Sequence, residues 1–177
     1  MIGNLTWVPA AGRPDLLAAP VAHALKEHAL GEHGDVRVAE IDPELADTAA
    51  FCERYDVPVA ASANCVIVAG RRGGETRYAA CMVLATRRAD VNGVVRRRLD
   101  ARKTSFAPMD QATALTGMEY GGITPLGLPG DWPILVDEEV GREPYVVIGS
   151  GVRRSKLLLP GPALAGLPGA EVLALAL

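Results

Sequence analysis

The chain has 177 residues, 49% of them hydrophobic, and a formal net charge of -3. This length allows one substantial core and no segment reads as a long linker, so we expect a single domain over residues 1–177. No apolar run approaches the roughly 20 residues that cross a bilayer, and the N-terminus lacks the pattern of a signal peptide. These features exclude a membrane protein and predict a cytoplasmic one.

The first third of the chain alternates helix and strand signals. A helix is predicted to begin at Pro20, which suits a first helical turn, and to run to about Leu30, with Gly31 or Gly34 as its stop. A strand over 36–41 follows. A second helix, which carries Phe51 and Tyr55, begins at Asp42-Pro43 or at Asp47-Thr48.

The middle of the chain predicts a β-hairpin, because apolar runs at 64–69 and 77–85 flank the glycine-bearing segment 70–74. Asp90 then opens a basic helix that ends near Leu99. The elements expected after it are a strand at 104–106, a helix at 110–116 closed by Gly117, strands at 134–136, 145–148, 156–159 and near Val172, and a short helix near Ala163. Some strands pair as hairpins and others are separated by helices. We therefore expect an α+β fold with a mixed, curled, barrel-like β-sheet flanked by helices.

Positive charge is concentrated in the middle of the chain. Residues 61–103 contain 10 Lys/Arg against 3 Asp/Glu, whereas the segments before and after them are acidic. Clusters of this kind are typical of surfaces that contact nucleic-acid phosphates. A solvated surface balanced by acidic neighbours in space is an equally good interpretation.

The cysteines and histidines do not predict a metal site. Cys52, Cys65 and Cys81 are odd in number and set among apolar neighbours, which favours buried thiols over a disulfide. The histidines recur every five residues, at His23, His28 and His33, and so spread around a helix axis instead of sharing one face.

The segment 121–127 packs three glycines and one proline into seven residues directly after a predicted helix. Glycine permits positive φ and close approach of a ligand to the backbone, while Pro125 restrains the turn. Such a loop can form the wall of a pocket. An ordinary tight connection has the same composition.

Further motifs accompany this loop in a fixed order. They are Lys103 after the basic helix, Thr116-Gly117 before the loop, and then Leu135-Val136-Asp137 and Gly149-Ser150-Gly151. Over residues 64–172 this spacing resembles the YbaK/EbsC family, the prolyl-tRNA-synthetase-associated domain. The resemblance implies a mixed barrel with flanking helices, and residues 1–60 would be a family-specific α/β extension packed on it.

The resemblance also implies an activity. The chain would be a trans-editing hydrolase that deacylates mischarged aminoacyl-tRNA, with a Cys-tRNA(Pro)-like or Ala-tRNA(Pro)-like substrate and no cofactor. Its partners would be the aminoacylated 3′ end of tRNA and an aminoacyl-tRNA synthetase, without DNA or a membrane. The amino acid, the tRNA and the oligomeric state are not defined by the sequence.

Site residues follow from the matching positions. Around the aminoacyl group and terminal adenosine would lie Gly121, Gly122, Thr124, Pro125 and Gly127, with Asp137 at the pocket edge and Gly149, Ser150 and Gly151 on the opposite wall. For Asp137, capping a helix at 138–140 is an equally good interpretation. Contacts to tRNA phosphates are expected from Arg96, Arg97, Arg98 and Arg102.

One position departs from the resemblance. Family members carry a lysine at the start of the first hairpin strand, where this chain has Asn64. An asparagine amide offers donors and an acceptor but no positive charge. Lys103 is a candidate for that charge, although a phosphate contact or a solvated residue explains it too. The candidate catalytic residues are therefore Asn64, Lys103 and Gly122.

The sequence contains no metal-ligand spacing, G-x-S-x-G motif or P-loop. The resemblance implies that the ribose hydroxyl of the substrate helps to activate water while backbone N–H groups polarise the carbonyl. The alternative is a catalytically inactive module that binds tRNA, an aminoacyl-nucleotide-like ligand or a synthetase.

Overall fold

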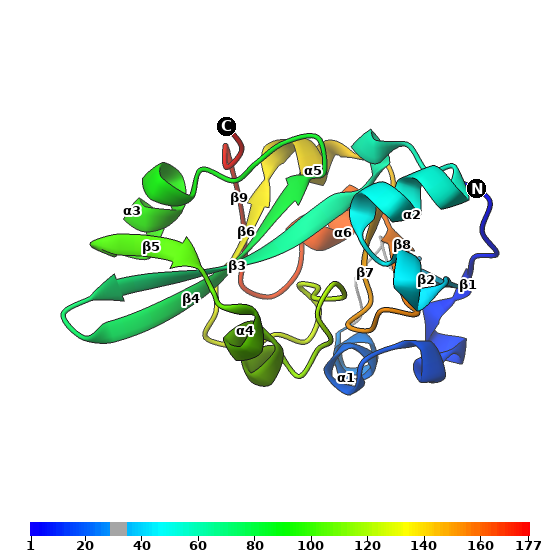
Figure 1. Ribbon diagram of the computed structural model, residues 1–177, viewed down its shortest axis with the longest axis horizontal. Helices are drawn as coiled ribbons and strands as arrows, with labels where there is room; N and C mark the ends of the chain where they lie inside the picture. Colours follow the sequence, from blue (N-terminus) through cyan, green and yellow to red (C-terminus); the bar gives the residue numbers. More distant parts are fainter. Residues whose placement is uncertain (29–34) are drawn as a thin grey trace.

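A computed structural model describes residues 1–28 and 35–177, which form two β-sheets flanked by helices (Figure 1). The strands are β1 (Val8–Pro9), β2 (Arg37–Glu40), β3 (Ala63–Arg72), β4 (Glu75–Leu84), β5 (Lys103–Phe106), β6 (Ile134–Asp137), β7 (Val146–Gly149), β8 (Ser155–Leu159) and β9 (Ala170–Leu173). The helices are α1 (Ala19–Glu27), α2 (Thr48–Tyr55), α3 (Arg96–Arg98), α4 (Met109–Thr116), α5 (Glu138–Arg142) and α6 (Gly161–Ala165). The predicted α+β class is confirmed.

The two sheets have different topologies. The order β1-β2-β8-β7 is antiparallel throughout, whereas β5-β3-β4-β6-β9 is mixed, because β4 pairs with β6 and β6 with β9 in parallel. A parallel bridge between Ser62 and Val147 joins the start of β3 to β7. The sheets thereby continue into each other as a curled surface, in agreement with the predicted barrel-like sheet, which over the described ranges is not closed into a barrel.

The β3–β4 hairpin is the longest element. Its strands pair at every position from Ala63↔Leu84 to Arg72↔Glu75, and Gly73 and Gly74 form the loop with φ values of 56° and 81°. Two-residue hairpin loops of this handedness require positive φ at both positions, which glycine adopts without steric cost. The far end of the hairpin projects away from the rest of the molecule together with β5 and α3 (Figure 1).

The N-terminal third follows the predicted order. Helix α1 contains Pro20 in its first turn and ends at Glu27, while the predicted stops at Gly31 and Gly34, and His33, lie outside the described residues. Helix α2 begins after Asp47, the second of the two predicted starts. No helix in the described ranges is both long enough and apolar enough to span a membrane.

Three groups of buried side chains make up the core. The largest lies between α1, α4, β6 and the faces of β7 and β8 that carry Ile148 and Leu157. A second group packs α2 onto the opposite face of β7 and β8, through Phe51, Val147 and Leu158. The third lies under α3, on the outer face of the hairpin. The β7–β8 pair is therefore covered on both faces, and α2 packs on the face that carries Val147 and Leu158.

Candidate active site

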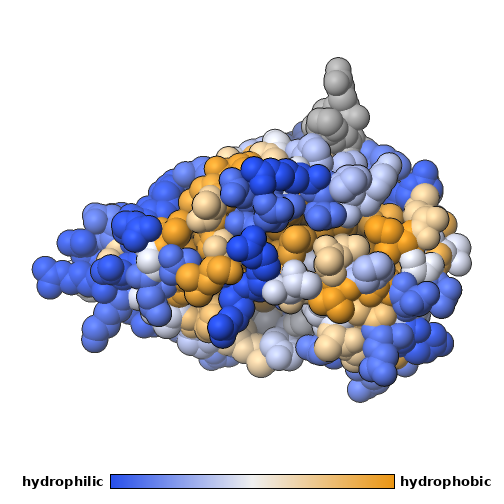
Figure 2. All heavy atoms as spheres, turned by 90° about the horizontal axis from the view of Figure 1, so that it is seen from above, coloured by the Kyte–Doolittle hydropathy of each residue, from blue (hydrophilic) through white to orange (hydrophobic). Residues whose placement is uncertain are grey.

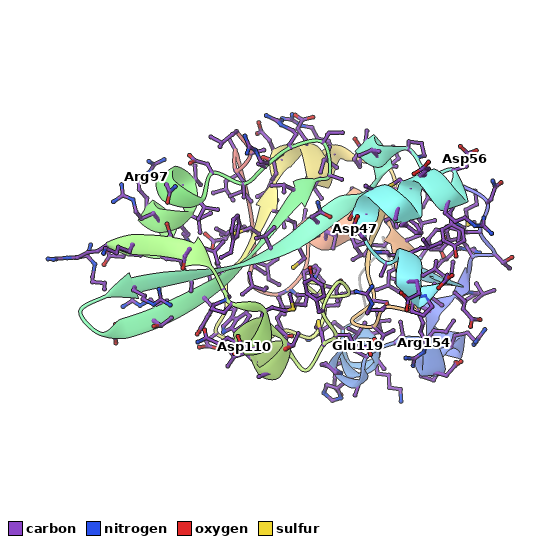
Figure 3. All side chains as sticks on the ribbon, viewed as in Figure 1. Asp47, Asp56, Arg97, Asp110, Glu119 and Arg154 are labelled. Carbon is purple, nitrogen blue, oxygen red and sulfur yellow. The ribbon has the colours of Figure 1, made fainter. Side chains whose placement is uncertain are left out.

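A cavity of about 590 Å³ lies where α2, the start of β3, the segment after α4 and the β7–β8 pair meet. Its polar lining comes from Asp47, Thr48, Ser62, Asn64, Cys65, Tyr120 and Lys156, and its glycines are Gly121 and Gly149. Figure 3 shows Asp47 at the start of α2, beside β3. The predicted candidates Asn64, Gly121 and Gly149, far apart in the sequence, thus share one cavity.

Strand register explains how these residues come together. Ser62 lies opposite Val147 in a parallel bridge, so two residues further along, Asn64 comes alongside Gly149. Gly149 in turn pairs with Lys156 across β7 and β8. Side chains at paired positions lie on the same face of a sheet. Asn64, Gly149 and Lys156 therefore form one row across three strands, on the face covered by α2.

Hydrogen bonds to the segment around the start of α2 fix both ends of this row. The Thr48 hydroxyl donates to Asn64 Oδ1 at 2.8 Å, which leaves the amide nitrogen of Asn64 as a donor. The Lys156 ammonium donates to the carbonyl oxygen of Ala46 at 2.9 Å and lies 5.2 Å from the centre of the Phe51 ring.

The glycine-rich loop packs directly on β7. The Gly151 amide donates to the Gly122 carbonyl at 2.7 Å, and a Cβ added to Gly149 would come within 2.5 Å of the same oxygen. Glycine at position 149 is therefore what lets the loop close over the cavity. Among the described residues, no acceptor binds the amides of Gly121 or Ile123, and both residues line the cavity.

Other predicted pocket residues lie elsewhere. Pro125 and Gly127 line a second cavity, of about 390 Å³, beside α1. Thr124 is fully buried, and its hydroxyl has no hydrogen-bond partner among the described residues. Ser150 is also buried, and its hydroxyl donates to backbone carbonyls. The loop therefore borders the main cavity only through its first part.

Asp137 does not line either cavity. Its Oδ1 accepts hydrogen bonds from the amides of Leu175 and Ala176, at 2.9 and 3.0 Å, and its Oδ2 from the Glu139 amide at 3.4 Å. The carboxylate thus caps α5 and fixes the end of the chain. Of the two interpretations that the sequence allowed for Asp137, a ligand contact and a helix cap, the structure shows the cap.

Lys103 lies far from Asn64. It pairs with Arg71 near the distal end of β3, whereas Asn64 lies seven residues earlier on that strand. At about 3.3 Å per residue, the separation along β3 is roughly 23 Å. The structure therefore does not bring Lys103 to the cavity, and the second sheet contributes Lys156 there instead.

Sequence reasoning placed Lys156 in a strand and missed its position in the site. All five residues of β8 are buried, and the lysine is only 7% exposed. Burial lowers the pKa of Lys156 from its ordinary value to about 8. The available signal was a single lysine in the run Ser155–Leu159, which three residues separate from the Gly149-Ser150-Gly151 motif.

The cysteines do not provide a nucleophile. All three are free, as predicted, and only Cys65 lines the cavity. Burial raises the pKa of the Cys65 thiol, and that of Cys81 to about 12, so both remain protonated at neutral pH. No cluster of possible metal ligands occurs in the part of the chain that the structure describes.

The basic segment forms the projecting end of the molecule. Arg98 pairs with Glu171 at 2.6 Å and Arg72 with Asp100 at 3.2 Å, whereas the exposed Arg97 and Arg102 pair with no described carboxylate. Figure 3 shows Arg97 on α3, and Figure 2 shows hydrophilic residues gathered over this end. Acidic neighbours thus neutralise part of the positive charge at this end, and Arg97 and Arg102 keep theirs without an ion pair to a described carboxylate.

Comparison with known proteins gives one family. The model of the aminoacyl-tRNA editing domain matches residues 42–167, and no curated protein sequence is significantly similar to the chain.

Solved structures share the fold. A protein provisionally named a trans-editing enzyme for prolyl-tRNA synthetase is 23% identical, with a TM-score of 0.74 over 90% of this chain and 96% of its own. A hypothetical protein is 20% identical, with a TM-score of 0.75 over 89% and 99%. A scaffold for computational epitope grafting is 24% identical, with a TM-score of 0.72 over 90% and 97%.

The packing of the loop on β7 can be tested by Gly149→Ala. The added methyl group collides with the Gly122 carbonyl, so the free energy of unfolding should fall by about 1–3 kcal/mol. Gly130→Ala is the control, because a Cβ there meets nothing within 4 Å, and its stability should change by less than about 0.5 kcal/mol. Chemical denaturation measures both, and equal stability of the two variants would contradict the packing.

Proposed function

Because the chain belongs to the aminoacyl-tRNA editing domain family, we propose that it hydrolyses the ester bond of mischarged aminoacyl-tRNAs in trans. The observation that carries this proposal is the position of the cavity. Every residue that lines it, from Ala46 to Lys156, lies within the matched segment. The name of the neighbour linked to prolyl-tRNA synthetase supports tRNA(Pro) as the tRNA and a synthetase as a partner. Cysteine or alanine as the wrong amino acid is what the family resemblance implies.

The cavity offers the groups that ester hydrolysis needs. Attack of water on the carbonyl places negative charge on its oxygen, which must be stabilised by donors in fixed positions. The free amides of Gly121 and Ile123 and the side-chain amide of Asn64 are such donors. We assign the activation of water to the ribose hydroxyl beside the ester, as the family resemblance implies, and not to the Cys65 thiol, whose pKa is raised by burial.

Tyr120 extends the site toward the nucleotide. Its side chain lines the cavity and is also 57% exposed, so one face of the ring is accessible to a ligand. Proteins bind unpaired bases by stacking them on aromatic rings. We assign Tyr120 to the terminal adenine, next to the loop that holds the aminoacyl group.

The projecting basic end supports contact with the body of the tRNA. Arg97 and Arg102 are exposed and pair with no described carboxylate, so phosphates can reach them without breaking an ion pair. Arg96 and Arg98 are less available, because Arg96 Nε donates to the Asn92 carbonyl and Arg98 pairs with Glu171. We therefore rank Arg97 and Arg102 first among the predicted contacts.

The proposed activity is tested with the purified protein and a panel of tRNAs charged with the wrong amino acid. At least one, with Cys-tRNA(Pro) and Ala-tRNA(Pro) tested first, should lose its aminoacyl group faster than in buffer, while correctly charged Pro-tRNA(Pro) should not. A protein that accelerates none of these reactions is not a deacylase. Acid-gel or radiolabel assays of the remaining aminoacyl-tRNA give the rates.

Replacement of Tyr120 by alanine should weaken binding of aminoacyl-tRNA by roughly 5- to 150-fold, because stacking of a base on an aromatic ring contributes about 1–3 kcal/mol. Tyr145→Ala is the matched control, since Tyr145 is also exposed but does not line the cavity. Filter binding or fluorescence anisotropy measures the affinities. Equal losses in the two variants would place the adenine elsewhere.

The double variant Arg97→Gln/Arg102→Gln should bind tRNA more weakly and with a flatter salt dependence. The slope of log K against log salt should decrease by about 0.7–0.9 for each phosphate that the variant no longer neutralises. Arg142→Gln, at an exposed arginine on α5 that pairs with Glu138 and Glu139, is the control for losing an arginine away from this end of the molecule. If the slope of the double variant equals that of the control, these arginines form only a solvated surface.

The second candidate function is a binding module without catalysis. The observation that favours it is Asn64, which stands where the family resemblance implies a lysine. Such a module would bind a non-hydrolysable aminoacyl-adenosine analogue, and its affinity would depend on Tyr120, but it would deacylate no tRNA. The panel and the binding assays together separate the two functions.

A further inference from the structure

The cavity contains one cation that the sequence did not assign to it. The chain has three lysines, of which Lys26 and Lys103 are exposed on α1 and β5. Lys156 is buried, and it is the only basic side chain that lines the cavity among the described residues. The positive charge absent at Asn64 is therefore present in the same cavity, on a strand of the other sheet.

The surroundings of Lys156 do not explain why a charged side chain occupies this buried position. Among the described residues, no carboxylate forms an ion pair with it, and its contacts are the Ala46 carbonyl and the Phe51 ring. Burying an ammonium group without a counter-ion lowers stability, and an apolar side chain of similar size commonly replaces such a group without loss. A buried unpaired cation beside a cavity is thus a candidate for ligand binding.

We propose that Lys156 is the substrate-binding cation of this site, with its ammonium group donating a hydrogen bond to the ester carbonyl oxygen of the bound aminoacyl-tRNA. The inference rests on the proposed function and adds a catalytic residue to it. Lys156 would supply from β8 the positive charge that the family resemblance places at the start of β3. Asn64, at the other end of the row, would hold the substrate through its amide nitrogen.

The geometry allows this role. An ammonium group has three N–H donors, and the Ala46 carbonyl accepts one of them at 2.9 Å. Between Asn64 and Lys156 the row contains only Gly149, which places no side chain in the way. The two ends of the row and the first part of the loop therefore offer hydrogen-bond donors to one cavity.

The chemical step leaves the lysine unchanged. Water adds to the carbonyl carbon, the bond from that carbon to the ribose oxygen breaks, and the proton released by water ends on the ribose oxygen. Negative charge develops on the carbonyl oxygen and then disappears as the acid forms. A protonated Lys156 stabilises that charge without giving up its proton.

The charged and titratable groups near Lys156 set the pH at which it is protonated. Burial lowers its pKa to about 8, Cys52 and Asp47 from the α2 segment act in the opposite direction, and Arg153 after β7 adds to the lowering. The ammonium form is thus present at neutral pH and is lost as the pH rises through about 8. The loss of the ammonium should therefore slow any increase of the deacylation rate with pH and bend the profile near pH 8.

The first test measures binding, which does not require turnover. The probe is an adenosine with an alanyl or cysteinyl group in amide linkage at its 3′ position, titrated calorimetrically. Lys156→Met should bind it at least tenfold more weakly than the wild type, whereas the exposed control Lys26→Met should bind it equally well. The melting temperature of Lys156→Met should equal or exceed that of the wild type, because a buried charge is removed. Unchanged affinity, or no binding to the wild type, would overturn the inference.

The second test measures deacylation against pH, corrected for the rate in buffer. The wild-type profile should bend near pH 8, and Lys156→Arg, whose guanidinium is not deprotonated, should keep partial activity without the bend. Equal rates for Lys156→Met and wild type would reject Lys156 but leave the deacylase standing. A wild type that deacylates nothing, but binds the probe through Lys156, would reject the deacylase and leave the binding role standing.

Discussion

The bridge between Ser62 and Val147 is the contact on which the cavity depends. It joins β7, an edge strand of one sheet, to the start of β3 in the other, and the Ser62 carbonyl accepts a hydrogen bond from the Ala85 amide at 2.8 Å. A shift of one residue in this register would turn Asn64 away from α2. The row that contains Asn64, Gly149 and Lys156 exists only because this register is fixed.

Electrostatics and topology are linked in this site. In a curled sheet, strands from distant parts of the chain present side chains to one cavity. Residues that are far apart in the sequence can therefore occupy neighbouring places in the site. The positive charge that a family resemblance assigns to β3 can therefore be supplied by β8 without a change of fold. The proposal requires only a cation in the cavity close to the bound carbonyl, since electrostatic interactions are stronger in surroundings of low dielectric constant than in bulk water.

Much of the fold could be predicted from the sequence, because local signals specified most elements. The hairpin followed from two apolar runs and a Gly-Gly turn, and α4 ended at Gly117, which has a φ of 69°. The strand β1 was missed, since two residues carry no periodic pattern and depend on pairing with β2. Of the cavity residues, Asn64, Gly121 and Gly149 were predicted from motif spacing. Lys156 and Tyr120 could not be predicted in this way, because pairing between the sheets decides which residues face the cavity.

The length of β3 has a consequence for the kind of molecule that can use both ends of it. Because β3 is extended and paired on both sides, the separation of roughly 23 Å along it between Asn64 and the position opposite Lys103 is fixed. A ligand as short as an aminoacyl-nucleoside cannot span that separation, whereas a polymer whose phosphates lie that far from its ester can. The length of the strand thus favours a polymer over a metabolite as the molecule that would contact both ends, independently of any side chain that recognises a base.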